Sequence, residues 1–128
     1  ERVGDHAENL IELFEYKIEH DLPFSDLAVG EFQMMIELAE SALAMAVESL
    51  DTADSKKAKQ VLVLEDEIDV MERSLRKSHI ERLNQGVCNP GSAIIFIDIL
   101  SNLERVGDHA NNIALIVLDI NKIRQEEA

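Results

Sequence analysis

The sequence predicts an all-α protein, an antiparallel helical bundle of four helices. Apolar residues recur at intervals of three and four along nearly all of the 128 residues, which is the period of an amphipathic helix. Glycine and proline number only five and two, so the chain has little material for turns. Trp is absent, and Phe and Tyr number four and one. This composition favours a few long helices over many short strands.

The first two helices are expected at about residues 1–20 and 25–50. In the first, one stripe follows the helical spacing and consists of Gly4, Ala7, Ile11, Phe14 and Ile18. Residues 20–23, which include a proline, end this helix. Ser25 is a suitable N-cap for the second helix, because a serine hydroxyl accepts a hydrogen bond from a free backbone N–H. The stripe of the second helix consists of Phe32, Met35, Ala39, Ala42 and Ala46.

The third and fourth helices are expected at about residues 55–85 and 90–125. The stripe of the third consists of Val61, Leu64, Ile68, Met71 and Leu75. Asn89 followed by Pro90 is typical of an N-cap with proline in the first helical position. The stripe of the fourth consists of Phe96, Leu100, Leu103, Gly107, Ala110, Ala114 and Val117. Four such stripes joined by short connections predict antiparallel packing of neighbouring helices.

An internal repeat divides the chain. The segment 1–10, ERVGDHAENL, recurs at 104–113 as ERVGDHANNI, with eight of ten positions identical. We interpret residues 1–128 as a single domain in which residues 1–22 are the last helix of a truncated first repeat. Residues 23–128 then form a complete second repeat of three helices.

Three pairs of carboxylates are spaced four residues apart, so each pair projects from one helix face. The pairs are Glu1 and Asp5, Glu65 and Asp69, and Glu104 and Asp108. The last two pairs flank the apolar stripes on the same side, so they are expected to converge if the third and fourth helices are neighbours. Four close carboxylates repel one another unless a proton or a cation neutralises them, and their oxygens suit Mg²⁺, Ca²⁺, Mn²⁺ or iron. The alternative is that these carboxylates only solvate helix faces.

Two further features of the repeat have structural explanations. His109, matched by His6, is interpreted as a hydrogen-bonding partner at the surface, although a ligand role stays open. Gly107, matched by Gly4, costs about 1 kcal/mol relative to alanine within a helix. Close approach of a neighbouring group to the helix backbone would explain both glycines.

Composition and missing motifs exclude several functions. The net charge of −14 disfavours nucleic acid and anionic membrane surfaces. The single cysteine, Cys88, has no partner for a disulfide within the chain. The densest apolar stretch, residues 93–97, is too short to insert in a membrane. There is no Gly-rich phosphate loop, no metalloprotease motif, and no nucleophile with an attendant base, so we do not expect an enzyme.

The segment 103–114, LERVGDHANNIA, resembles the third-helix motif of the PhoU family. Residues 65–69, EDEID, resemble the acidic motif of that family's second helix. The segments 76–83 and 96–103 are most similar to the cytoplasmic PhoU-like domain that follows the membrane part of bacterial sodium/phosphate cotransporters. A free-standing PhoU regulator is the alternative, and a structural interaction module without metal is a further one.

The resemblance implies a fold of three-helix repeats that binds metal ions, including multinuclear iron clusters, through paired acidic motifs. By position, Glu65, Asp69, Glu104 and Asp108 match one pair of motifs. Glu1 and Asp5 match half of a second pair, whose other half this chain lacks. The implied function is regulation of phosphate transport and phosphate homeostasis. The implied partners are a transporter membrane domain and phosphate-signalling proteins, at a cytoplasmic location. Apart from the resemblance, the apolar stripe of the first helix can be buried against the other three helices, or part of it can pair with a second copy, and we expect a dimer.

Overall fold

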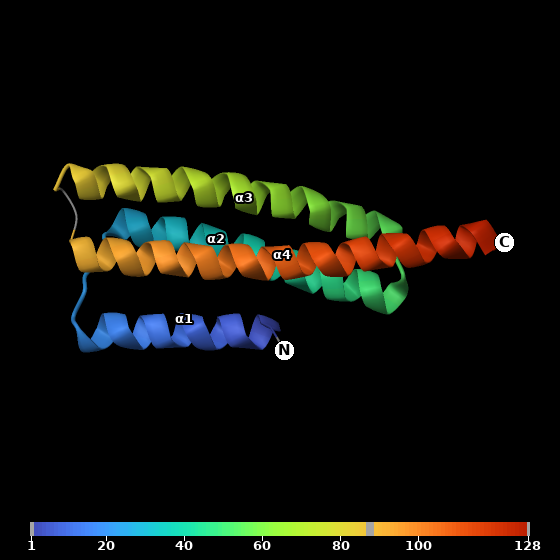
Figure 1. The fold of residues 1–128 in the computed structure, drawn as a ribbon, viewed down its shortest axis with the longest axis horizontal. Coiled ribbons are helices and arrows are strands. Elements are labelled where there is room, and N and C mark those ends of the chain that lie inside the picture. The colour runs from blue at the N-terminus through green and yellow to red at the C-terminus, as the bar shows by residue number, and fades with distance from the viewer. Residues whose placement is uncertain (1, 87–88, 128) are drawn as a thin grey trace.

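The computed structural model describes residues 2–86 and 89–127, so Glu1 and Cys88 lie outside the described residues. The described chain forms four helices and no strand: α1 (Arg2–Glu19), α2 (Asp26–Thr52), α3 (Ser55–Asn84) and α4 (Pro90–Glu127). Successive helices run in opposite directions, and α2 and α4 therefore begin at the same end of the bundle (Figure 1). The prediction of an all-α helical bundle is confirmed.

The helix ends follow the capping chemistry of the sequence. The Ser25 hydroxyl accepts a hydrogen bond from the Ala28 N–H at 3.1 Å, and the Asn89 side chain accepts one from the Ser92 N–H at 3.1 Å. Both predicted N-caps are therefore confirmed. The second helix extends to Thr52, two residues beyond its expected end, because Ala53 adopts a left-handed conformation (φ 52°) and its N–H closes the last turn.

Helices α2, α3 and α4 pack against one another and enclose the core. The predicted stripes of α2 and α4 are buried, and so are Val61 and Ile68 of α3. The remaining stripe residues of α3 are partly buried and pack against the same core; they are Leu64, Met71 and Leu75. Four buried alanines on α2 keep its buried face narrow, which allows two long helices to pack closely on it.

Only part of the predicted stripe of α1 meets its neighbours in the described structure. This helix packs along α4, and Phe14 also meets the Phe32 ring of α2 edge-on, with 5.2 Å between ring centres. However, Ile11 and Ile18 are 58% and 75% exposed, and the contacts come from Leu10, Leu13 and Phe14. The physical reason is that the apolar face of α1 is broad, and only the side of it that carries Leu10, Leu13 and Phe14 meets a neighbour among the described residues.

Candidate metal centre

Two pairs of carboxylates converge at the middle of α3 and α4. One oxygen from each of Glu65, Asp69, Glu104 and Asp108 lies within 4.8 Å of the other three. All four residues are partly buried. Because α3 and α4 are antiparallel neighbours, the spacing of four residues on each helix aligns one pair with the other. The structure thus brings these four predicted residues together.

Gly107 allows the two helices to approach at this point. A Cβ atom added to Gly107 would lie 3.2 Å from Cδ1 and 3.4 Å from Cγ2 of Ile68, which is fully buried. The explanation of this glycine by close approach is confirmed. Gly4, its counterpart on α1, has nothing within 4 Å of the corresponding position in the described structure, so close approach does not explain it among the described residues.

The electrostatics of the cluster are unfavourable for four ionised carboxylates. Burial, together with neighbouring Asp69 and Asp108, raises the pKa of Glu65 to about 8. Burial, together with the charges of Asp108 and Asp69, raises the pKa of Glu104 to about 7. Without a cation, the cluster therefore holds protons near neutral pH that ordinary carboxyl groups would have released.

The donor set fits a hard cation. The Oδ1 atom of Asp69 is buried without a hydrogen-bond partner, so a lone pair lacks a donor. Among the described residues, no ion pair to Lys, Arg or His involves any of the four carboxylates. An all-oxygen set of this kind is typical of Mg²⁺, Ca²⁺, Mn²⁺ and iron sites.

The repeated segment of α1 does not join this cluster. Asp5 is exposed and is not among the four grouped carboxylates, and Glu1 lies outside the described residues. Instead α1 contributes His6, whose Nε2 lies 3.2 Å from Nε2 of His109. This contact agrees with the interpretation of the two histidines as hydrogen-bonding partners. The repeat places equivalent residues face to face between α1 and α4.

Sequence reasoning missed that Glu72 belongs to a separate ion pair. Glu72 follows the acidic motif by one turn, but it is only 6% exposed and accepts a hydrogen bond from Arg76 Nε at 2.7 Å. Arg76 also donates to the Ser101 hydroxyl on α4 at 2.8 Å. The spacing of four residues between Glu72 and Arg76 was the available signal. Glu72 is thus neutralised, unlike the four carboxylates of the cluster.

Comparison with known proteins gives two matches. A family model described as the PhoU domain matches residues 32–117. The phosphate-specific transport system accessory protein PhoU homolog 1 of Thermotoga maritima is 32% identical over 122 residues, covering 94% of this chain and 51% of that protein. The chain therefore spans about half the length of this curated relative. No solved structure matches.

In the described part of the chain, no helix combines the length and apolarity that a membrane crossing requires.

Proposed function

The chain belongs to the PhoU domain family, and from this membership we propose that it is a metal-binding regulatory domain of phosphate transport and phosphate homeostasis. The observation that carries the proposal is the convergence of four carboxylates from the two family motifs within 4.8 Å. The curated relative is named as an accessory protein of a phosphate-specific transport system, which supports the same biological context.

In this proposal Glu65, Asp69, Glu104 and Asp108 hold one or more cations. The unpartnered Oδ1 of Asp69 and the lack of ion pairs to the cluster among the described residues support this assignment. The family resemblance favours iron in a multinuclear cluster, whereas the donor set also suits Mg²⁺ and Mn²⁺. Glu1 and Asp5 stay predicted ligands of a second site, for which Asp5 is exposed on α1.

A cation would reverse the local charge of a surface that otherwise repels phosphate. The chain carries a net charge of −14, and the cluster itself is a concentration of negative charge. A bound cation supplies positive charge to which an oxyanion can bind. The role of the four carboxylates is to hold the cation at a defined position between α3 and α4. Binding there could shift the contact between this domain and a transporter, with a coupling of about 1–3 kcal/mol.

Two parent proteins fit this role. The resemblance of residues 76–83 and 96–103 supports a cytoplasmic domain of a sodium/phosphate cotransporter. The match to an accessory protein supports a free-standing regulator of phosphate uptake and signalling. In both cases the partner is a phosphate transporter or a protein of phosphate signalling, and the domain acts at the cytoplasmic side of the membrane.

Phosphate uptake tests the proposal. Cells or vesicles that carry the whole parent protein should show an altered dependence of uptake on phosphate concentration when Glu104 and Asp108 are both replaced by alanine. A matched control replaces Glu67 and Asp119, which are exposed carboxylates on the same two helices. Identical uptake curves for the parent, the site variant and the control, with the domain folded in all three, would refute regulation through this cluster.

A further inference from the structure

A pocket of about 350 Å³ lies at the end of the bundle where α2 and α4 begin and α3 ends. It is separate from the carboxylate cluster, which lies about 12–15 Å away along α3 and α4 at 1.5 Å per residue. Its lining residues are Pro23, Phe24, Ser25, Ala28, His79, Arg82, Asn89, Ser92, Ala93 and Phe96. No acidic residue lines it, although 26 of the 128 residues are acidic.

Hydrogen-bonding groups without partners concentrate in this pocket. Among the described residues, five buried side-chain nitrogen or oxygen atoms lack a hydrogen-bond partner, and three of these belong to its lining: Arg82 Nε, Ser92 Oγ and His79 Nε2, which has only Glu31 Oε1 nearby, at 3.4 Å. His79 and Ser92 are only 5% and 7% exposed. Leaving a buried polar group unsatisfied is unfavourable. The guanidinium can only donate and the hydroxyl can donate, so a ligand that supplies acceptor oxygens would satisfy both.

The local charge favours one negative charge on such a ligand. The N-termini of α2 and α4 each contribute about half a positive charge. Arg82 Nη2 donates to Glu31 Oε1 at 3.3 Å, so Glu31 offsets the guanidinium while lying outside the lining. Burial and the charge of Arg82 lower the pKa of His79, whose Nε2 is 3.4 Å from Glu31, so its ring is neutral near pH 7. Asp26 in the first turn of α2 carries a negative charge, and the Lys17 ammonium, 4.9 Å from the centre of the Phe24 ring, carries a positive one. These two charges offset each other, so the sum is about one positive charge.

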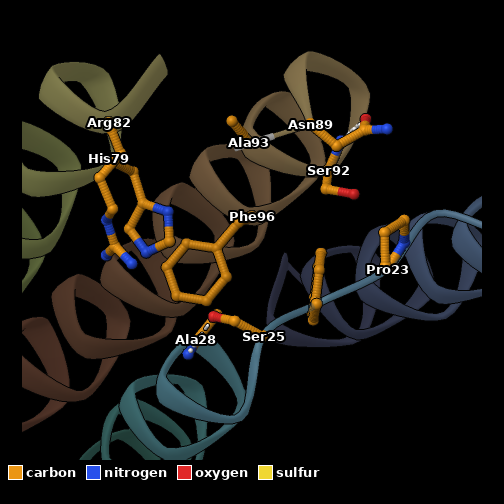
Figure 2. Close-up of a pocket in the computed structure, with 10 residues that line it drawn as sticks. Pro23, Ser25, Ala28, His79, Arg82, Asn89, Ser92, Ala93 and Phe96 are labelled. Atoms are coloured by element: carbon orange, nitrogen blue, oxygen red, sulfur yellow. Dashed lines mark hydrogen bonds between the residues drawn. The ribbon is translucent and has the colours of Figure 1, made fainter. Parts of the chain in front are cut away.

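The pocket has two polar ends separated by an apolar wall. In Figure 2, His79 and Arg82 lie on one side of the Phe96 ring, and Asn89 and Ser92 lie on the other. The His79 ring stacks on Phe96, with 3.9 Å between ring centres, and the Phe24 ring meets Phe96 edge-on at 5.7 Å. A ligand that reaches both ends therefore needs a carbon body between two oxygen functions.

We propose that this pocket binds a small organic carboxylate. Its carboxylate lies beside Arg82 at the α2 N-terminus, its carbon body packs against Phe24 and Phe96, and a second oxygen function accepts a hydrogen bond from Ser92. Binding needs no metal, so the pocket functions independently of the carboxylate cluster.

Titrations of the EDTA-treated protein, followed by NMR, test the proposal with three aromatic probes. 4-Hydroxybenzoate has a carboxylate and a second oxygen, benzoate lacks the second oxygen, and benzamide is the neutral counterpart of benzoate. We expect saturable binding of 4-hydroxybenzoate with shifts at Ala28 and Ala93, binding of benzoate about fivefold weaker, and binding of benzamide at least about tenfold weaker than benzoate. Inorganic phosphate, which has no carbon body and carries more charge, should bind more weakly than either carboxylate.

Variants locate the binding site. Arg82→Gln should weaken both carboxylates about tenfold, because it removes the charged donor. Ser92→Ala should weaken 4-hydroxybenzoate about fivefold and leave benzoate unchanged, and it alters no charge. Lys57→Gln is the matched control, since Lys57 also pairs with a glutamate, Glu48, but lies outside the pocket. It should bind like the unmodified chain.

Four results would overturn the proposal. These are no saturable binding of either carboxylate, equal binding of benzamide and benzoate, tighter binding of inorganic phosphate, and an unchanged affinity for 4-hydroxybenzoate in Ser92→Ala. If Arg82→Gln fails to fold because Glu31 loses its partner, the comparison of benzoate with benzamide and the Ser92→Ala titration still decide the outcome.

Discussion

The metal-free domain should lose stability as the pH rises from about 5 to about 8. The pKa values of Glu65 and Glu104 are about 8 and about 7 in the folded chain, above the ordinary value of 4.5. The folded state therefore holds protons that the unfolded state has already released. Stability falls as the pH rises above 4.5, and the loss is complete once the pH exceeds the folded values.

The size of this loss follows from the pKa of Glu65, with a correction for exposure. A rise from 4.5 to about 8 corresponds to about 5 kcal/mol at 1.36 kcal/mol per pH unit. Glu65 and Glu104 are only partly buried, so solvent screens much of the repulsion. They also share Asp69 and Asp108 as neighbours, so their contributions do not add. We expect a loss of about 2 kcal/mol for the whole cluster.

Urea unfolding in the presence of EDTA at pH 5.5 and pH 8.5 measures this loss. The double variant Glu65→Gln with Glu104→Gln should be about 2 kcal/mol more stable than the unmodified chain at pH 8.5, with a much smaller difference at pH 5.5. Because both chains contain the same histidines, comparing them removes the histidine contribution. The control Glu67→Gln with Asp119→Asn changes the charge equally at exposed positions on α3 and α4. A difference between variant and unmodified chain that is the same at both pH values would refute the reasoning.

Further predictions concern local features. In thermal unfolding, Gly4→Ala should raise the free energy of unfolding by up to about 1 kcal/mol. Alanine is favoured over glycine within a helix, and nothing lies within 4 Å of the new Cβ. Gly107→Ala should instead destabilise by up to about 2 kcal/mol, because Ile68 must move, and equal effects at both glycines would contradict this. Ser25→Ala should cost about 1 kcal/mol through loss of the α2 N-cap, whereas an unchanged midpoint would argue against the cap. The apolar face of α1 should support a dimer in light scattering that Ile18→Glu dissociates; a monomer at all concentrations would exclude it.

The helices and their caps were predictable because they depend on local sequence. Ser25 and Asn89 cap helices through residues three positions away, and these contacts need no tertiary information. The stripes of α2, α3 and α4 were also predictable, because their members recur at intervals of three and four residues. The contact side of α1 was not, because its apolar face is broad and only tertiary packing decides which side of that face meets a neighbour.

The carboxylate cluster was predictable for a similar reason. Glu65 and Glu104 each directly follow a residue of their stripes, so antiparallel packing of α3 on α4 brings them to the same side. The end pocket was not predictable, because it joins side chains from α2, α3, α4 and the connection before α2. The relative positions of Arg82 on α3 and Ser92 on α4 depend on how these two helices and α2 are aligned along the bundle. No spacing in the sequence encodes that alignment.

Metal content by mass spectrometry tests the central claim most directly. Protein purified without chelators or affinity tags should carry at least one bound cation per chain, or bind one after incubation with iron, Mn²⁺ or Mg²⁺. Replacing Glu104 and Asp108 with alanine should remove this metal, and replacing the exposed Glu67 and Asp119 should not. Full metal content in the Glu104/Asp108 variant, or no binding by the unmodified chain, would contradict the assignment of these carboxylates as metal ligands.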